Sequence, residues 1–562
     1  MSYKRKKLLF AVKRFGNFMK IFLKNKKGMA GLLIILSFCI IAIFADFIAP
    51  YNALGQDPKR GYLPVAPHFL PPAWLRYIPP WLGGNPKLTE TISDVIKNPS
   101  SPKLWKDGGD LNALGDLDFI EIYTSEKDCP GSSGGSLAIR LSKKPEHVDN
   151  LTVHIYKEIY YPFTGPPGRF QGTIAFLVDG TVNKDGKLEV PLNITITVGP
   201  SDGEKWKVFP PPGAMKILGR WGPLPWVETM GLSHGPGTSV IVDKPVGWVF
   251  TMTRSKNQTY SYMIDSVSYY MMLICDVEYR NKMPYGRVCE TIFSKTPGNY
   301  TFDVQITFMN LKKASENASS TIYIDEFGFI LWGSCFGLMG TDYQGRDLFS
   351  QLIYGTRISL YVGILAAVIS VGIGLVVGIF SGYMGGVIDE AVMRVNDFLL
   401  VIPFLPLLMV LTVVFKSTSL ELLIILLGIL GWNGFARVVR SQVLSLKERP
   451  FIEATKAAGA GTAYIIFRHL VPNVMPLVYV TLATSVPSAI VVEASLSWLG
   501  FFDPNRMSWG RMLHDFTAQA ATKTFWWWVL PPGICISLMS VSFILLGYAL
   551  DEVLNPRLRV RR

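Results

Sequence analysis

Six apolar runs, each long enough to cross a bilayer as a helix, are spread along the 562-residue chain. A helical crossing needs about 20 largely apolar residues. Prolines within these runs, such as Pro403 and Pro487, are tolerated where neighbouring helices satisfy the freed backbone groups. The pattern predicts an α-helical membrane protein with six transmembrane helices, at about 28–50, 358–383, 397–415, 420–439, 476–500 and 525–550.

A polar block, 51–337, separates the first apolar run from the other five. Apolar and polar residues alternate within it, as in LTVHIYKEIYY at 151–161 and YTFDVQITFMN at 300–310. This period of two, interrupted by Gly, Pro and Asp, is typical of strands and favours a sandwich. The block therefore predicts a large, mostly β domain inserted between the first and second helices. Its proline-rich entry predicts a stiff segment near the membrane surface, where Trp74 and Trp81 could anchor.

Charge predicts the orientation. Only 17% of residues are charged, but residues 1–28 carry ten Lys or Arg and no acid. Such a tail could bind nucleic acid, yet directly before an apolar run it favours a cytoplasmic anchor and no nucleic-acid partner. The basic tail, 1–27, then lies inside, and six crossings return the C-terminus to the cytoplasm. The basic loop 440–472 also lies inside, and 51–337 is extracellular.

Two features of the inserted block suit an exterior, oxidising location. It holds every Asn-X-Ser/Thr glycosylation candidate in the chain, at Asn150, Asn193, Asn257, Asn299 and Asn317. It also holds four cysteines, with possible disulfides Cys275–Cys289 and Cys129–Cys335; free buried thiols are the alternative. Its histidines show no metal-ligand spacing, so we expect a docking or scaffolding domain rather than an enzyme.

The segment EATKAAGAGTAYIIFRHLVPNVMP, 453–476, lies in the long cytoplasmic loop. An Ala-rich helix is broken at Gly459 and Gly461, because glycine adopts backbone angles that other residues avoid. An amphipathic helix follows and leads through Pro472 into the next span. Such a helix–turn–helix can fit a groove of a soluble partner; an ordinary interfacial helix is the alternative.

This segment resembles the EAA loop of ABC importer permeases. Glu453, Ala454, Gly459 and Pro472 match in register, whereas Thr455 replaces the second Ala of the motif. Further strings, including GTDYQGRDLFSQLIYGTRISLYVG and EASLSWLGFFDP, are similar to the dipeptide and oligopeptide branch, C-type subunit. The resemblance covers about 1–50 and 338–562, which it identifies as the permease core. The large inserted block departs from the family, which usually has a short loop there.

The resemblance implies a type I importer permease that forms a pathway with a second homologous permease. Two ATPase subunits and an extracellular solute-binding protein complete the complex, alongside membrane lipid. Glu453, Ala454 and Gly459 would contact an ATPase, with Arg449 and Arg468 as flanking candidates. The chain lacks a Walker A string, so we expect no cofactor and no enzyme activity on it, with ATP and Mg on the partner subunits.

Cargo remains open between di- or oligopeptides and oligosaccharides, and a membrane-anchored extracellular receptor is a lesser alternative. Glu493, an acid within the fifth span, is a pathway candidate, although a structural pairing is the other interpretation. Asp342, Arg346 and Asp347 are expected to form an ion network or to touch the binding protein. The glycines of the second span predict tight helix packing.

Overall fold

The computed structural model describes residues 22, 25–54, 66, 69–92, 112–115, 117–125, 136–181, 189–190, 192–209, 260–265, 288–520 and 525–554. The chain divides into two compact units. The membrane unit comprises Met1–Phe69 and Met339–Arg562, and the β unit comprises Leu70–Leu338. The second crossing, after Leu338, lies at the end of the predicted polar block 51–337, whereas the first, after Phe69, lies 18 residues past residue 51 (69 − 51).

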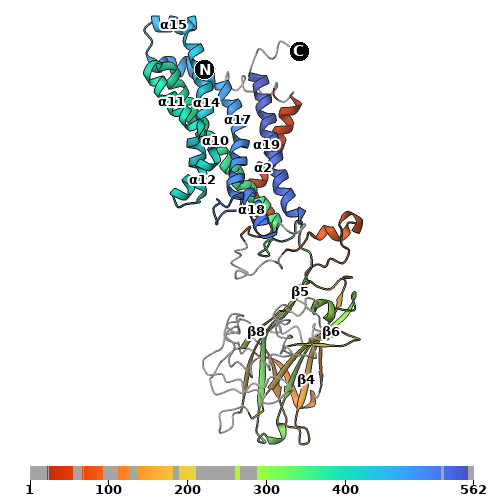
Figure 1. Ribbon diagram of the computed structural model, residues 1–562. Helices are drawn as coiled ribbons and strands as arrows, with labels where there is room; N and C mark the ends of the chain where they lie inside the picture. Colours follow the sequence, from red (N-terminus) through yellow and green to blue (C-terminus); the bar gives the residue numbers. More distant parts are fainter. Residues whose placement is uncertain are drawn as a thin grey trace, which may run out of the picture. The chain divides into compact units, whose positions relative to one another are not determined.

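The membrane unit is helical (Figure 1). Its described elements are α2 (Lys26–Ile43), α3 (Ala45–Ile48), α10 (Leu348–Met384), α11 (Gly386–Val401), α12 (Phe404–Val414), α13 (Leu420–Leu430), α14 (Asn433–Lys447), α15 (Pro450–Ala457), α16 (Thr462–Ile465), the π-helical turn η5 (Ile466–Leu470), α17 (Val471–Trp498), α18 (Trp509–Ala520) and α19 (Trp526–Leu554).

Five helical stretches of the described chain are long and apolar enough to cross a bilayer, and a bent pair would make a sixth. The five are Lys26–Ile43, Leu348–Met384, Leu420–Lys447, Thr462–Trp498 and Trp526–Leu554. The pair is α11 with α12, which meet at an angle of 91°. The expected single helix at 397–415 therefore contains a break. Proline causes it: Pro403 cannot donate a backbone hydrogen bond, and Ile402 before it is extended, at φ −75° and ψ 127°.

A second boundary also differs from the expectation. The helix expected at 420–439 continues through α13 and α14 to Lys447. Two further apolar residues hold this extension, because Val443 is fully buried and Leu446 is nearly so. The loop expected at 440–472 consequently starts about two helical turns later than predicted.

Glycines allow α10 to lie directly against α14. Gly374, Gly378 and Gly382 recur every four residues and so share one face of α10. A Cβ added at Gly378 would lie 2.6 Å from the Ala436 carbonyl oxygen, and one at Gly382 would lie 2.9 Å from the Arg440 carbonyl oxygen. The neighbouring atoms are backbone and cannot move aside. The predicted tight packing of the second span is confirmed at this contact.

A buried ion network holds α18 at the start of α10. The Arg346 Nε donates to Asp342 Oδ2 at 2.5 Å, and its Nη2 donates to Asp515 Oδ2 of α18 at 3.0 Å. Gln351 of α10 also donates to Asp342 Oδ2, at 2.7 Å. Asp347 caps α10 by accepting from the backbone N–H and hydroxyl of Ser350. The expected network at these residues is confirmed, with Asp515 as a member that sequence reading missed.

The β unit contains two five-stranded antiparallel sheets. One has the order β1-β4-β9-β6-β7 and the other β2-β3-β10-β5-β8. The strands are β1 (Asn112–Gly115), β2 (Ile120–Ser125), β3 (Ser136–Leu141), β4 (Leu151–Tyr161), β5 (Arg169–Gly180), β6 (Leu192–Pro200), β7 (Trp206–Phe209), β8 (Tyr260–Asp265), β9 (Gly298–Phe308) and β10 (Ser320–Trp332). Short helical turns accompany them: η1 (Ala73–Tyr77), η2 (Pro80–Leu82), η3 (Leu117–Phe119), α9 (Val288–Ile292) and η4 (Leu311–Lys313).

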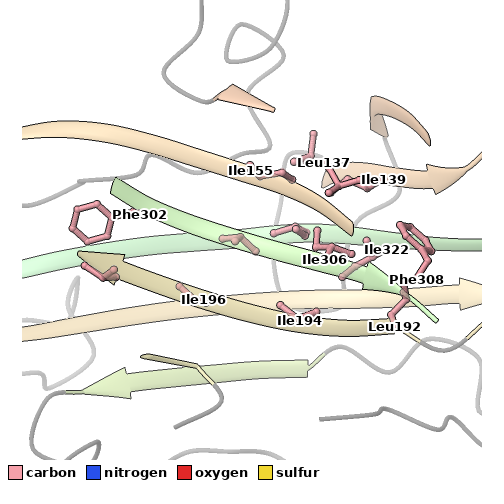
Figure 2. Packing of buried hydrophobic residues seen from close by; sticks show 14 of the residues in the cluster. Leu137, Ile139, Ile155, Leu192, Ile194, Ile196, Phe302, Ile306, Phe308 and Ile322 are labelled. Carbon is pink, nitrogen blue, oxygen red and sulfur yellow. The ribbon is translucent and has the colours of Figure 1, made fainter. Parts of the chain in front are cut away.

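Side chains from both sheets form one hydrophobic core (Figure 2). Ile139 and Ile322 come from one sheet, and Ile155, Ile194 and Ile306 from the other. Along β9 every second residue is apolar and belongs to the core, from Tyr300 through Phe302, Val304 and Ile306 to Phe308, and the polar Thr301 and Asp303 between them are buried as well. This alternation places one face of the strand in the core, as the sequence pattern predicts for a sandwich.

The α10–α14 contact yields a stability test. Gly378→Leu should lower the thermal unfolding midpoint of the purified protein, because overpacking typically costs about 1–3 kcal/mol and this contact is with rigid backbone. Gly372→Leu is the matched control on the same helix, since nothing lies within 4 Å of a Cβ there. Equal midpoints for the two variants would contradict the contact.

The ion network yields a second test. Arg346→Met leaves Asp342 and Asp515 buried without their countercharge, and breaking a buried pair typically costs about 3–5 kcal/mol. Arg394→Met is the control, because Arg394 and its partner Glu390 are 77% and 71% exposed and such pairs contribute about 0–1 kcal/mol. Unfolding midpoints in detergent measure both variants. A fall no larger for Arg346→Met than for Arg394→Met would show that the network does not hold α18.

Candidate functional site

The candidate site begins with the coupling segment, which we define as Arg449–Pro472. Arg449 is extended, and Pro450 follows as the first residue of α15, a position that suits proline. Glu453 lies in the first turn, where a carboxylate interacts favourably with the helix dipole. The Arg449, Glu453 and Ala454 side chains are exposed.

Gly459 ends α15 in a Schellman motif. Its backbone N–H donates to the Lys456 carbonyl at 2.9 Å, and the Ala460 N–H donates to the Thr455 carbonyl at 3.2 Å. This motif requires a left-handed residue, and Gly459 has φ +80°. Nothing lies within 4 Å of a Cβ built there, so the requirement for glycine comes from the backbone angle and not from crowding.

The inner face of the segment is fixed to the membrane helices. Ile452 is fully buried in a cluster that includes Ile379 of α10, Val439 of α14 and Val474 of α17. The Lys456 ammonium lies 5.7 Å from the centre of the Tyr383 ring near the end of α10. The segment therefore shares one packed cluster with these three helices.

The outer face is apolar and aromatic. Phe451, Tyr464 and Phe467 are 44%, 55% and 75% exposed. The His469 ring lies between the first two, with ring centres 6.0 Å from Phe451 and 5.7 Å from Tyr464. Arg468 and Pro472 are exposed beside them. We call Phe451, Tyr464, Phe467 and His469 the aromatic face; such an exposed patch is typical of an interaction site. Sequence reading missed it because its members come from two different helices.

The second half of the segment runs into the membrane without interruption. Thr462–Trp498 forms one continuous helical stretch, in which η5 joins α16 to α17. The Asn473 side-chain amide donates to the His469 carbonyl at 2.7 Å, which satisfies a group left by the wider π turn. Figure 1 shows α15 at one end of the helical bundle and α18 at the other.

A cavity of about 450 Å³ lies among the helices that the segment contacts. Its lining comes from α10, the α11–α12 bend, α13, α14 and α17. The polar members are three serines and an asparagine, and no lining residue of the described chain is charged. They are Ser370, Asn433, Ser485 and Ser488. These groups were not singled out from the sequence, because isolated serines in an apolar run carry no distinctive spacing.

Glu493, the pathway candidate, does not line this cavity. It is 2% exposed, and its Oε1 accepts from the Ser497 hydroxyl one turn along α17 at 2.8 Å. A Cβ at Gly510 of α18 would lie 2.6 Å from the Ala494 Cα, so α18 packs closely beside this carboxyl. The position supports the structural interpretation of Glu493.

The remaining candidates lie in the β unit. The Cys335 thiol is free, and its Sγ donates to the Thr89 carbonyl at 3.2 Å rather than forming the suggested disulfide. Burial raises the pKa of Cys335 to about 11. Its suggested partner Cys129 lies outside the described residues. Cys289 is buried in the β core, and its suggested partner Cys275 is also outside the described residues.

The glycosylation candidates are all at positions within the inserted block. Asn150, Asn299 and Asn317 are exposed in the structure, as modification requires. Asn193 lies in β6, and Asn257 lies outside the described residues. Modification at these residues stays a prediction.

Comparison with known proteins places these features in a family. Residues 374–560 match the family described as binding-protein-dependent transport system inner membrane component. Residues 14–72 match the N-terminal TM domain of oligopeptide transport permease C.

Two permease relatives each align with part of the chain. The Bacillus subtilis dipeptide transport system permease protein DppC is 40% identical over 221 residues, which are 39% of this chain and 68% of that protein. The oligopeptide transport system permease protein OppC of the same organism is 41% identical over 222 residues, 39% of this chain and 72% of that protein.

Similar solved structures include the inward-facing MetNI methionine ABC transporter, at 19% identity and a TM-score of 0.30, over 38% of this chain and 97% of that chain. TmCBM61 in complex with β-1,4-galactotriose is similar at 8% identity and a TM-score of 0.19, over 39% of this chain and 86% of that chain. The sequence relatives show that this chain belongs to the ABC dipeptide and oligopeptide permease family, as a C-type subunit.

Proposed function

We propose that this chain is one of two homologous permease halves of an ATP-driven importer. Membership of a binding-protein-dependent transport family implies ATPase and solute-binding partners. The observation that carries the proposal is the aromatic face, because it is exposed on a segment whose other side packs on cavity-lining helices. We propose that one of two ATPase subunits covers this face, with Glu453 and Arg449 at the contact.

The orientation follows from charge. We propose six crossings, with α11 and α12 together counted as one, and with both termini in the cytoplasm. Lys26, Lys27, Arg449, Lys456 and Arg468 lie at the ends of helices on the proposed cytoplasmic side, as the positive-inside rule favours. The β unit is then extracellular, where it would brace the solute-binding protein or the second permease.

Coupling requires that ATPase motion reaches the pathway. When ATP draws the two ATPases together, α15 moves with the subunit that holds it. Ile452 passes this displacement to α10 and α14, and the continuous Thr462–Trp498 stretch passes it to α17. These helices line the cavity, so their rigid movement alternates its access between the two sides of the membrane.

We propose di- or oligopeptides as cargo, because the relatives are named for dipeptide and oligopeptide transport. A peptide pathway must accept side chains of either sign. The uncharged cavity lining of serine, asparagine and apolar residues suits that requirement, since a buried fixed charge would repel one class of peptide.

Coupling is tested at two neighbouring glycines. Gly459→Val forces a β-branched residue to φ +80°, a left-handed strain of at least about 1–2 kcal/mol, which reshapes the turn and should uncouple ATP hydrolysis from uptake. Gly461→Val is the control, because Gly461 has φ −69° and equally open surroundings. Uptake per ATP hydrolysed by the reconstituted complex is the measurement. Normal coupling in the Gly459 variant, with both variants folded, would contradict the assignment.

Cargo is tested by competition. Uptake of a labelled dipeptide or tetrapeptide into vesicles containing the purified complex should require ATP and fall with excess unlabelled peptide. An excess of oligosaccharide should leave it unchanged. Oligosaccharide uptake with no peptide uptake would overturn the peptide proposal, and purification without any ATPase subunit would support the receptor alternative.

A further inference from the structure

Large apolar side chains are exposed mainly at one end of the β unit. Six large apolar side chains are exposed among the described residues of this unit. One of them, Val148, lies just before the start of β4 and away from the other five. Tyr77, Trp81 and Leu82 belong to the proline-rich segment at the entry of the inserted block, and Leu338 contacts that segment. Tyr160 lies at the far end of β4. Singly exposed apolar residues are ordinary, but a cluster marks an interaction site.

The cluster is carried by a closed loop, Leu75–Asn85, which we call the aromatic loop. The Asn85 backbone N–H donates to the Leu75 carbonyl at 3.0 Å and closes it. Leu82 and Gly84 N–H groups donate to the Pro79 carbonyl at 2.9 Å and 3.2 Å. Gly84 approaches so closely that an added Cβ would lie 1.8 Å from the Ile78 carbonyl oxygen. The loop is therefore preformed.

The other side of the loop is attached to the sandwich. Leu75 is 4% exposed, while Tyr77 and Trp81 are 73% and 74% exposed. The Arg76 guanidinium lies 4.9 Å from the Tyr77 ring centre and 5.4 Å from that of Phe163, and it pairs with Glu90 at 3.0 Å. These contacts hold the apolar side chains outward.

The aromatic loop begins only a few residues after the chain leaves the membrane unit. Phe69 belongs to that unit, and Tyr77 follows eight residues later, a reach of at most about 28 Å. On the return path, the Trp74 indole N–H donates to the Leu338 carbonyl at 2.8 Å. The next residue, Met339, is buried in the core of the membrane unit. The loop is thus tied to both points where the chain passes between the units.

We propose that the aromatic loop is a lipid anchor, with Tyr77, Trp81 and Leu82 inserted at the headgroup–acyl boundary of the bilayer. Trp and Tyr favour this boundary, because their rings are apolar while their N–H and O–H groups still reach water. The short tether favours lipid, since only eight residues separate Tyr77 from Phe69 of the membrane unit. The loop enters the outer leaflet of the bilayer, and this choice of leaflet rests on the proposed orientation of the chain. Of the two tryptophans expected to anchor, this assigns the role to Trp81 and gives Trp74 a structural hydrogen bond.

A nitroxide label tests the anchor in the full complex in phosphatidylcholine nanodiscs. The label is attached to the cysteine of the Trp81→Cys variant, and in a second sample to that of the Leu82→Cys variant. The signal from labelled native cysteines is measured on the unsubstituted chain and subtracted. Val148→Cys is the matched control, an exposed apolar site at the opposite end of β4, about 33 Å along the strand. Collision rates with oxygen, which concentrates in lipid, and with water-soluble Ni(II)EDDA are measured by power saturation.

The anchor predicts an oxygen-to-nickel ratio several-fold higher at 81 and 82 than at 148. Equal ratios would overturn the proposal, because the loop would then lie in water. Protection from both reagents would also overturn it, since protein would be covering the loop. Labelling of Val148→Cys in intact cells with a membrane-impermeant maleimide tests the orientation separately; failure there changes the leaflet but leaves the measured depth standing.

Discussion

The membrane unit depends on the close approach of α10 and α14. No side chain separates their backbones at Gly378, where the Ala436 carbonyl lies within van der Waals distance of the glycine position. α10 is 37 residues long, about 55 Å at 1.5 Å per residue. It joins the Asp342–Arg346–Asp515 network at its start to the coupling segment at its end. Without the glycine contact, these two ends would not share one rigid axis.

Much of the membrane fold is readable from the sequence, because bilayer thickness imposes a length on every apolar run. The positions of α10, α17 and α19 follow from that rule alone. The length rule fails at Pro403, because the apolar run continues there although the helix is broken. It fails again in α14, whose buried positions are interleaved with polar and charged residues that are exposed or half-buried, so that mean hydropathy falls before the helix ends at Lys447.

The candidate site, too, was predictable from the sequence only in part. Glu453 and Gly459 were found because a local motif carries them, and the Schellman hydrogen bonds explain the glycine physically. The aromatic face was missed because Phe451 and Tyr464 meet only in three dimensions. In the β unit, alternation predicted a strand such as β9, but the pairing of β9 with both β4 and β6 joins residues at least 100 positions apart. No local pattern encodes such neighbours.

The unbroken helix from Thr462 to Trp498 has a mechanical consequence. It contains a π turn at η5 and two internal prolines, Pro476 and Pro487, which are places where a helix can bend. Two adjacent glycines at the junction of α10 and α11, Gly385 and Gly386, have φ +69° and +57°, and Gly386 has no neighbouring atom within 4 Å of its Cβ position. Glycine adopts this left-handed conformation at no steric cost, so the α10–α11 junction and the bends of the Thr462–Trp498 stretch are the places where the backbone of the membrane unit turns with least strain.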